Sequence, residues 1–196
     1  MATTSHNLDG ARYEFRVWGK HRKACRVLSK LATAETTEQI EDCYVLVSDP
    51  AWNAKVRDSR LKLKQLVGHR RGFERWVATW HRAAHDTPAP FDELYSELEL
   101  DRVRSSKKFS LPDAVASLED DSDTKVLFVT KHRRRYRIGS IKAEVTKIDV
   151  EGSDIQLRTV AIEGGNLKDL VALRRRLGLE NQPNVPMHVA LEDQAA

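Results

Sequence analysis

Basic side chains recur at every second position in several short segments of this sequence. Lys131, Arg133 and Arg135 follow one another in this way, and Lys62 and Lys64 do so in an earlier segment. Because successive side chains of a β-strand point to opposite faces, this spacing places the basic groups on one face of each strand. Several such faces brought together would form a wet, positively charged interior. An interior of that kind is suited to holding a polyanion.

A phosphate-rich anion and a metal ion would need different charged groups. Arg can pair with two phosphate oxygens at once, and Lys supplies a compact positive charge. If a divalent cation took part in a reaction, carboxylates would have to hold it against the phosphates. The basic candidates for triphosphate binding are Arg16, Lys55, Arg57, Lys62, Lys64, Arg75, Lys131, Arg133 and Arg135, and the candidate metal ligands are Glu14, Glu144 and Glu163.

Each of these segments has a simpler interpretation when it is taken alone. Alternating Lys and Arg residues usually form the solvated face of a sheet. The basic run at 133–135 could also be a surface patch or contact nucleic acid. The phosphate hypothesis therefore gains weight only from several strands together and from the carboxylates among them.

Length and composition set the frame for these candidates. The 196 residues make one large domain or two small ones, with 40% hydrophobic and 32% charged residues and a net charge of +4. The charge is segregated: residues 125–147 hold eight Lys or Arg and a single acid, Glu144, whereas residues 92–124 hold ten acids and four basic residues. The basic part is thus a specific surface.

Several classes of protein do not fit the sequence. Cys25 and Cys43 form no C-x-x-C and no metal-ligand spacing, so a reducing compartment is expected. No apolar run reaches the length of a membrane span, and the first residues contain no hydrophobic signal core. These features predict a cytoplasmic protein without a membrane partner.

The hydrophobic pattern divides the chain into strands and helices. Period-two alternation and turn residues predict eight strands, and a helical stripe with Asn166 as its N-cap and Gly178 after its end predicts a late helix. The expected strands are 12–18, 42–47, 51–56, 60–66, 73–77, 125–137, 141–148 and 155–163, the expected helices are 20–34 and 167–177, and a helical insert is expected at about 78–124.

This order of elements predicts an α+β fold with an antiparallel sheet. Eight strands with charged inner faces indicate a closed β-barrel, or tunnel, with helices packed on the outside. We expect a flexible N-terminal tail at 1–11, a single tunnel domain at 12–190 and a C-terminal tail at 191–196.

The same layout resembles the CYTH superfamily, the triphosphate tunnel metalloenzymes. The resemblance covers roughly residues 12–190. It implies an eight-stranded antiparallel tunnel, in which basic residues bind a triphosphate and glutamates bind Mg²⁺ or Mn²⁺. The matching segments are Glu14-Phe-Arg16, Asp42-Cys-Tyr44, Lys55-Val-Arg57, Leu61-Lys-Leu-Lys64, Phe73-Glu-Arg75-Trp76, Lys131-His-Arg133-Arg-Arg135, Ala143-Glu144-Val145, Val160-Ala-Ile-Glu163 and Leu177-Gly-Leu179.

The sequence departs from the family pattern in its acidic positions. The opening E-x-E-x-K signature is here Glu14, Arg16 and Trp18, and the late E-x-E pair is Ala161 and Glu163. The number of carboxylates falls while the number of basic residues stays, which favours the anion over a free cation.

Three functional hypotheses follow from these observations. The first is a basic tunnel that binds a triphosphate-containing anion and has metal-dependent phosphohydrolase activity. The second is a CYTH-like module that binds a nucleotide or polyphosphate without catalysis. The third, less favoured, is a nucleic-acid or protein interaction domain with its basic strands on the outside. Oligomeric state stays open.

Overall fold

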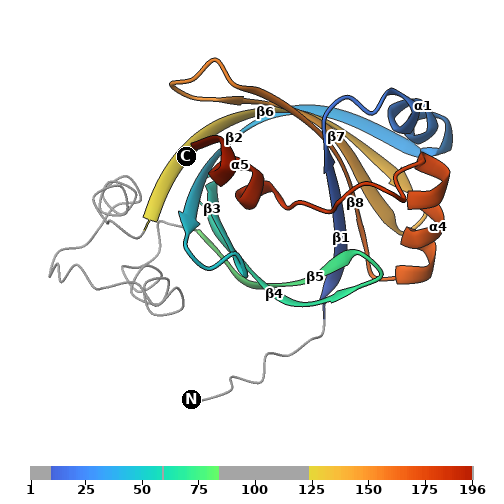
Figure 1. The fold of residues 1–196 in the computed structure, drawn as a ribbon, viewed down its shortest axis with the longest axis horizontal. Coiled ribbons are helices and arrows are strands. Elements are labelled where there is room, and N and C mark those ends of the chain that lie inside the picture. Colours follow the sequence, from blue (N-terminus) through green and yellow to red (C-terminus); the bar gives the residue numbers. More distant parts are fainter. Residues whose placement is uncertain (1–9, 59, 84–123, 196) are drawn as a thin grey trace, which may run out of the picture.

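The strands of this protein close into a single antiparallel barrel. The computed structural model describes residues 10–58, 60–83 and 124–195. In the described residues the strands follow the order β1-β5-β4-β3-β2-β6-β7-β8 around the barrel (Figure 1). The predicted α+β barrel is therefore confirmed. The strands are β1 (Arg12–Trp18), β2 (Ala34–Val47), β3 (Trp52–Arg57), β4 (Arg60–Arg70), β5 (Phe73–Ala83), β6 (Thr124–Ile138), β7 (Ile141–Val150) and β8 (Gln156–Gly164).

Three described helices accompany the barrel: α1 (Arg22–Leu31), α4 (Leu167–Leu177) and α5 (Met187–Ala195). The bounds of α4 are the predicted ones. Asn166 caps its start by accepting hydrogen bonds from the backbone N–H groups of Lys168 and Asp169, at 3.0 and 3.4 Å. Gly178 ends it with a φ of 72°, a left-handed conformation that glycine adopts without strain. The first helix is shorter than the predicted 20–34. No described helix is long and apolar enough to cross a membrane.

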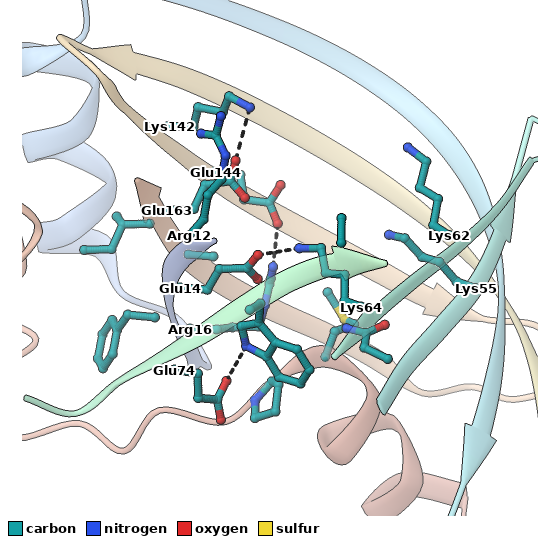
Figure 2. A pocket seen from close by; sticks show the side chains of 18 of the residues that line it. Arg12, Glu14, Arg16, Lys55, Lys62, Lys64, Glu74, Lys142, Glu144 and Glu163 are labelled. Carbon is teal, nitrogen blue, oxygen red and sulfur yellow. Dashed lines mark hydrogen bonds and ion pairs between the residues drawn. The ribbon is translucent and has the colours of Figure 1, made fainter. Parts of the chain in front are cut away.

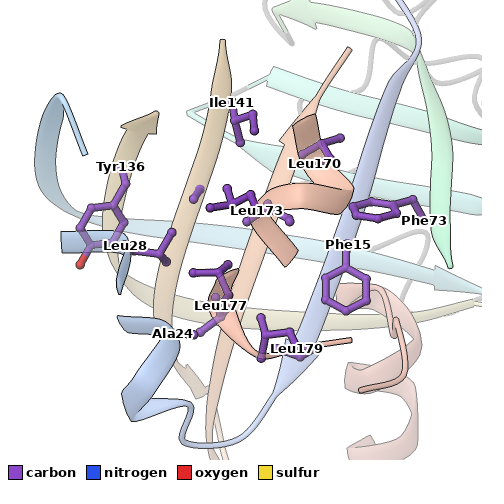
Figure 3. Close-up of a cluster of buried hydrophobic side chains, with 14 residues drawn as sticks. Phe15, Ala24, Leu28, Phe73, Tyr136, Ile141, Leu170, Leu173, Leu177 and Leu179 are labelled. Carbon is purple, nitrogen blue, oxygen red and sulfur yellow. The ribbon is translucent and has the colours of Figure 1, made fainter. Parts of the chain in front are cut away.

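Helices α1 and α4 cover the outside of one wall of the barrel. Alternation turns Phe15 and Val17 of β1 outward, where they pack with Leu28 of α1 and with Leu170 and Leu177 of α4 (Figure 3). Each of these side chains is at most 1% exposed. This layer is the main hydrophobic core, and it lies between the helices and the strands.

Helix α5 packs on the inner side of the barrel instead. Met187 and Leu191 contact Tyr44, Leu46 and Ile148, which β2 and β7 turn inward. The segment before α5 is tied to β1, because Val185 N–H donates to the Arg16 carbonyl and Trp18 Nε1 donates to the Val185 carbonyl, at 3.0 and 2.9 Å. Hydrocarbon therefore fills this end of the interior, where Figure 1 shows α5 within the ring of strands.

The structure differs from the predicted elements at three further places. Strand β2 begins at Ala34 rather than at 42. The sequence did not predict its first half, because this half is polar on both faces and shows no alternation of hydrophobicity. Strand β5 runs to Ala83, so residues 78–83 of the expected helical insert are strand. The expected C-terminal tail begins at Leu191, which is fully buried in α5. The rest of the insert, 84–123, and residues 1–9 of the expected N-terminal tail lie outside the described residues.

Candidate functional site

The inward faces of the strands enclose a charged cavity of about 500 Å³. Ligand sites in proteins are commonly of this size. Ten basic and four acidic residues line it, so positive charge is in excess. The basic residues are Arg12, Arg16, Lys55, Arg57, Lys62, Lys64, Lys131, Arg133, Arg135 and Lys142.

Eight of the nine basic residues selected from the sequence line this cavity, and Arg75 does not. On β5 the alternation turns Glu74 and Trp76 inward, and Arg75 between them faces outward. Its guanidinium lies 5.9 Å from the ring centre of Tyr13, a cation–π contact on the outer wall. Arg75, which was predicted to bind triphosphate, is therefore not among the residues that the fold brings together at the cavity.

Asp42 holds three of the cavity's basic residues in place. Its carboxylate is fully buried and accepts hydrogen bonds from Arg57 Nη2 at 2.6 Å and from Lys131 Nζ at 2.8 Å, while Lys55 Nζ lies 3.3 Å away. Burial opposes ionisation of Asp42, but these three cations outweigh it and hold the pKa of the carboxyl well below its usual range. Lys131 also donates to the hydroxyl of Tyr44 at 2.5 Å.

The three cations around Asp42 also repel one another. Burial and the neighbouring Lys131 lower the pKa of Lys55 well below its ordinary value. Burial also lowers the pKa of Lys131 to about 8, although Asp42 favours its charged form. One carboxylate thus does not fully compensate three buried cations. A further anion in the cavity would favour the charged forms of both lysines.

Glu144 lies between two arginines. Arg16 Nη2 donates to Glu144 Oε1 at 2.8 Å, and Arg133 Nη1 donates to Glu144 Oε2 at 3.4 Å. Burial opposes ionisation, but Arg16 and Arg133 outweigh it and lower the pKa of Glu144 to about 2. Arg133 also pairs with Glu38 of β2. Both oxygens of Glu144 are therefore engaged by basic side chains.

The remaining carboxylates of the cavity form a row across three neighbouring strands. Glu74, Glu14 and Glu163 are Cα partners in sequence from β5 through β1 to β8. Glu14 pairs with Lys64, and Glu163 pairs with Lys142 at 3.2 Å, as Figure 2 shows.

Glu74 differs from its neighbours in the row because no basic residue pairs with it among the described ion pairs. It accepts instead from Trp76 Nε1 at 3.1 Å. Burial, together with the nearby charge of Glu14, raises the pKa of Glu74 to about 7 despite this hydrogen bond. Glu74 thus changes charge near neutral pH.

The carboxylates predicted as metal ligands all face the cavity but do not form a ligand set. Within the described part of the chain, no three His, Cys, Asp or Glu side chains are grouped closely enough to hold a metal ion. Glu14, Glu144 and Glu163 each have a basic partner instead. Octahedral Mg²⁺ or Mn²⁺ would require free carboxylate oxygens, so the residues as arranged do not fit such an ion.

Sequence reasoning assigned no role to several residues of the site. Asp42 entered only as the start of an expected strand and within a family match. An acid two positions before Tyr44, on the same face of a run that becomes apolar, was nevertheless a detectable signal of a buried, paired carboxylate. Arg12 lies two residues from Glu14, and Lys142 lies two residues from Glu144, so both point inward with those glutamates. The same alternation could have selected them.

Comparison with known proteins adds information about the fold. No family model matches the sequence, and no curated protein matches it. Among solved structures, the chain is similar to the PH1012 protein from Pyrococcus horikoshii OT3, with 17% identity and a TM-score of 0.55 over 92% of this chain and 98% of that one.

Two further structures have a similar fold. A putative adenylyl cyclase from Hippeastrum, HpAC1, described as having a dominant triphosphatase activity, has 13% identity and a TM-score of 0.51, with 94% and 95% of the two chains covered. A conserved hypothetical protein from Pyrococcus furiosus has 15% identity and a TM-score of 0.51, with 90% and 96% covered. The resemblance to CYTH-like tunnel proteins is thereby confirmed for the fold.

Proposed function

We propose that this protein binds a triphosphate-containing anion, such as tripolyphosphate or a nucleoside triphosphate, inside the barrel. The observation that carries the proposal is the cavity of about 500 Å³ with ten basic residues facing it from five strands and only four carboxylates among them. A triphosphate has roughly four negative charges near neutral pH and would compensate this excess. The triphosphatase activity reported for the Hippeastrum protein is in keeping with it.

Two local features support an anionic ligand. The Nε atom of Arg133 is buried and has no hydrogen-bond partner in the described structure. A buried donor without a partner is costly, and a phosphate oxygen would satisfy it. Lys55 and Lys131 have lowered pKa values because they are buried close to other cations. Binding an anion would relieve both costs, so the empty barrel is less stable than the occupied one.

The proposal is tested with Arg133→Ala and a matched control on the same strand. Arg134 is the next residue, faces outward and pairs with Glu35 on the surface. We expect Arg133→Ala to weaken tripolyphosphate binding by about tenfold or more in titration calorimetry, whereas Arg134→Ala changes it little. Equal affinity of both variants and the wild type, or no binding by the wild type at low salt, would overturn the proposal.

Metal-dependent phosphohydrolysis is the second candidate function. The observation in its favour is that Glu14, Glu144 and Glu163 all face the same cavity as the basic residues. Their ion pairs would have to open before they could hold Mg²⁺ or Mn²⁺. Release of phosphate from tripolyphosphate or nucleoside triphosphates with either metal, lost in Glu144→Gln and Glu163→Gln, would establish it. No turnover with either metal would exclude it.

The nucleic-acid hypothesis has less support in this structure. It required the basic strand faces to lie on the outside of the barrel. Eight of the nine selected basic residues line the interior cavity instead. Binding of a duplex or single strand with a steep salt dependence would revive it.

A further inference from the structure

The position of Arg16 follows from the register of three neighbouring strands. Arg16 of β1 is the Cα partner of Ala161 of β8, and Ala161 is the partner of Glu144 of β7. The short side chain of Ala161 leaves room for the Arg16 guanidinium to cross over β8 and reach Glu144. Arg16 also donates to Thr159 Oγ1 at 3.3 Å. Three strands therefore fix a positive group in the cavity wall.

Two other carboxylates of the cavity, Glu14 and Glu163, are compensated in the same manner. The ammonium of Lys64 meets Glu14, and the ammonium of Lys142 meets Glu163, so each candidate metal ligand has a cation from the chain itself. Figure 2 shows both pairs, with Arg16 at Glu144. Lys142 and Glu163 are on the adjacent strands β7 and β8, whereas Lys64 and Glu14 are on β4 and β1, with β5 between them. A divalent cation entering this region would have to displace these cations and would be repelled by them.

The positive charge that a metal ion would bring is thus already supplied by basic side chains of the protein. A metal ion in a phosphate site neutralises phosphate oxygens and is itself neutralised by carboxylates. Arg16, Lys64 and Lys142 each pair with a carboxylate and also line the cavity, so they can do both. Arginine also offers several N–H donors in a fixed plane, which suits phosphate oxygens.

We infer that the cavity binds its phosphoanion free of divalent metal, with Arg16, Lys64 and Lys142 supplying the positive charge at the carboxylates. This inference rests on the proposed function and specifies the form of its ligand. Mg²⁺ complexed to a triphosphate lowers the negative charge of the ligand and brings a second positive charge toward these side chains. Magnesium is therefore a competitor for the ligand in this protein.

The first experiment is a titration of the full chain with sodium tripolyphosphate in excess EDTA and again in excess Mg²⁺. We expect binding in EDTA and an affinity about tenfold lower in Mg²⁺, because complexation reduces the charge of the ligand. Binding that requires Mg²⁺ or Mn²⁺ would overturn the inference while leaving the proposed function intact.

The second experiment measures Mn²⁺ binding to the free chain by electron paramagnetic resonance. The wild type should bind no Mn²⁺ in the cavity. Arg16→Glu removes the cation from Glu144 and adds a carboxylate, so it should gain a Mn²⁺ site. The matched control is Lys62→Glu, which makes the same charge reversal at a position surrounded by cations, beside its Cα partner Lys55. This variant should gain no Mn²⁺ site.

Folding is checked for each variant by circular dichroism and thermal melting. Arg16→Gln removes the positive charge without adding a negative one and serves if Arg16→Glu does not fold. It should weaken tripolyphosphate binding in EDTA and gain no Mn²⁺ site. A Mn²⁺ site in the wild type that is lost in Glu144→Gln would overturn the inference. If tripolyphosphate does not bind under any condition, the proposed function fails and the inference fails with it, whereas binding that requires Mg²⁺ or Mn²⁺ overturns the inference alone.

Discussion

The inner and outer faces of the same barrel wall are chemically opposite. Outward from β1 and β8, Phe15, Val17 and Ile162 are buried in hydrocarbon beneath α1 and α4. Inward from the same strands, Arg16 and Glu163 face the charged cavity. Alternation along a strand separates these two environments by a single residue.

This difference separates the sources of stability and of binding. Burial of apolar side chains on the outer face favours folding by roughly 25 cal/mol for each Å² removed from water. The charged groups on the inner face lose hydration, and their mutual attraction offsets this cost only in part. We therefore expect outer substitutions to change stability alone and inner substitutions to change ligand binding as well.

The largest effect is expected at Asp42. Replacing it with Asn leaves Lys55, Arg57 and Lys131 without their shared counter-charge and should lower the free energy of unfolding by about 3–5 kcal/mol. Urea unfolding measures this loss, and tripolyphosphate should recover more stability in the variant than in the wild type. The control is Asp149→Asn on the outer face, where the pairs with His132 and Lys147 are partly exposed. A similar loss in both variants would show that burial of the cations carries no special cost.

A smaller effect is expected from the outer core. Leu170→Ala, at a fully buried position of α4, should lower the free energy of unfolding by about 3 kcal/mol and leave the affinity for tripolyphosphate unchanged. Urea unfolding and calorimetry test the two parts, with the exposed Lys168→Ala on the same helix as the control. A change in affinity comparable to that of Arg133→Ala would break the separation between the two faces.

Arg174 provides an intermediate case at the edge of the outer core. Its guanidinium lies 4.0 Å from the ring centre of Phe15 and donates to the carbonyls of Leu179, Glu180 and Gln182. Arg174→Ala should cost about 2 kcal/mol in thermal or urea unfolding. Its neighbour Arg175 is 81% exposed in its side chain, so Arg175→Ala should have almost no effect. Equal losses of stability in Arg174→Ala and Arg175→Ala would show that Arg174 contributes no more than an exposed surface charge.

A pH dependence of stability is expected from Glu74. Its pKa is raised from 4.5 to about 7 in the folded protein, mainly by burial, so ionisation is less favourable in the folded than in the unfolded state. Its contribution to stability should therefore fall as pH rises from about 4.5 to about 7 and stay constant above that range. Melting temperatures between these pH values should fall less steeply in Glu74→Gln, which keeps an acceptor for Trp76. Parallel curves for the two proteins would contradict this.

The barrel could be predicted largely from short-range pattern. Alternation identified at least part of each of the eight strands, and the bounds of α4 followed from Asn166 and Gly178, because caps and turns depend on neighbouring residues. The first half of β2 could not be found in this way. Its polar residues are held by pairing with β6, where Glu35 and Glu38 meet Arg134 and Arg133. That pairing joins segments about a hundred residues apart.

The site was predictable to the level of strand faces. The alternation of side chains along each strand placed eight of the selected basic residues and all three glutamates at the cavity. It gave the wrong face for Arg75, because Glu74 and Trp76 are the β5 residues that turn inward there. The alternation within one strand also says nothing about the register between neighbouring strands. The contact of Arg16 with Glu144 across Ala161 depends on that register, so the compensation of the glutamates could not be predicted. The metal ions and the cytoplasmic location stay predictions.

The position of α5 bears on the kind of molecule that can be bound. Pro186 and Met187 line the cavity beside the basic side chains, and Met187 packs with Tyr44 and Leu191, so the wall offers hydrocarbon as well as charge. A phosphate ester with an apolar group next to its phosphates would find partners for both of its parts, whereas an inorganic phosphate chain would use the charged wall alone.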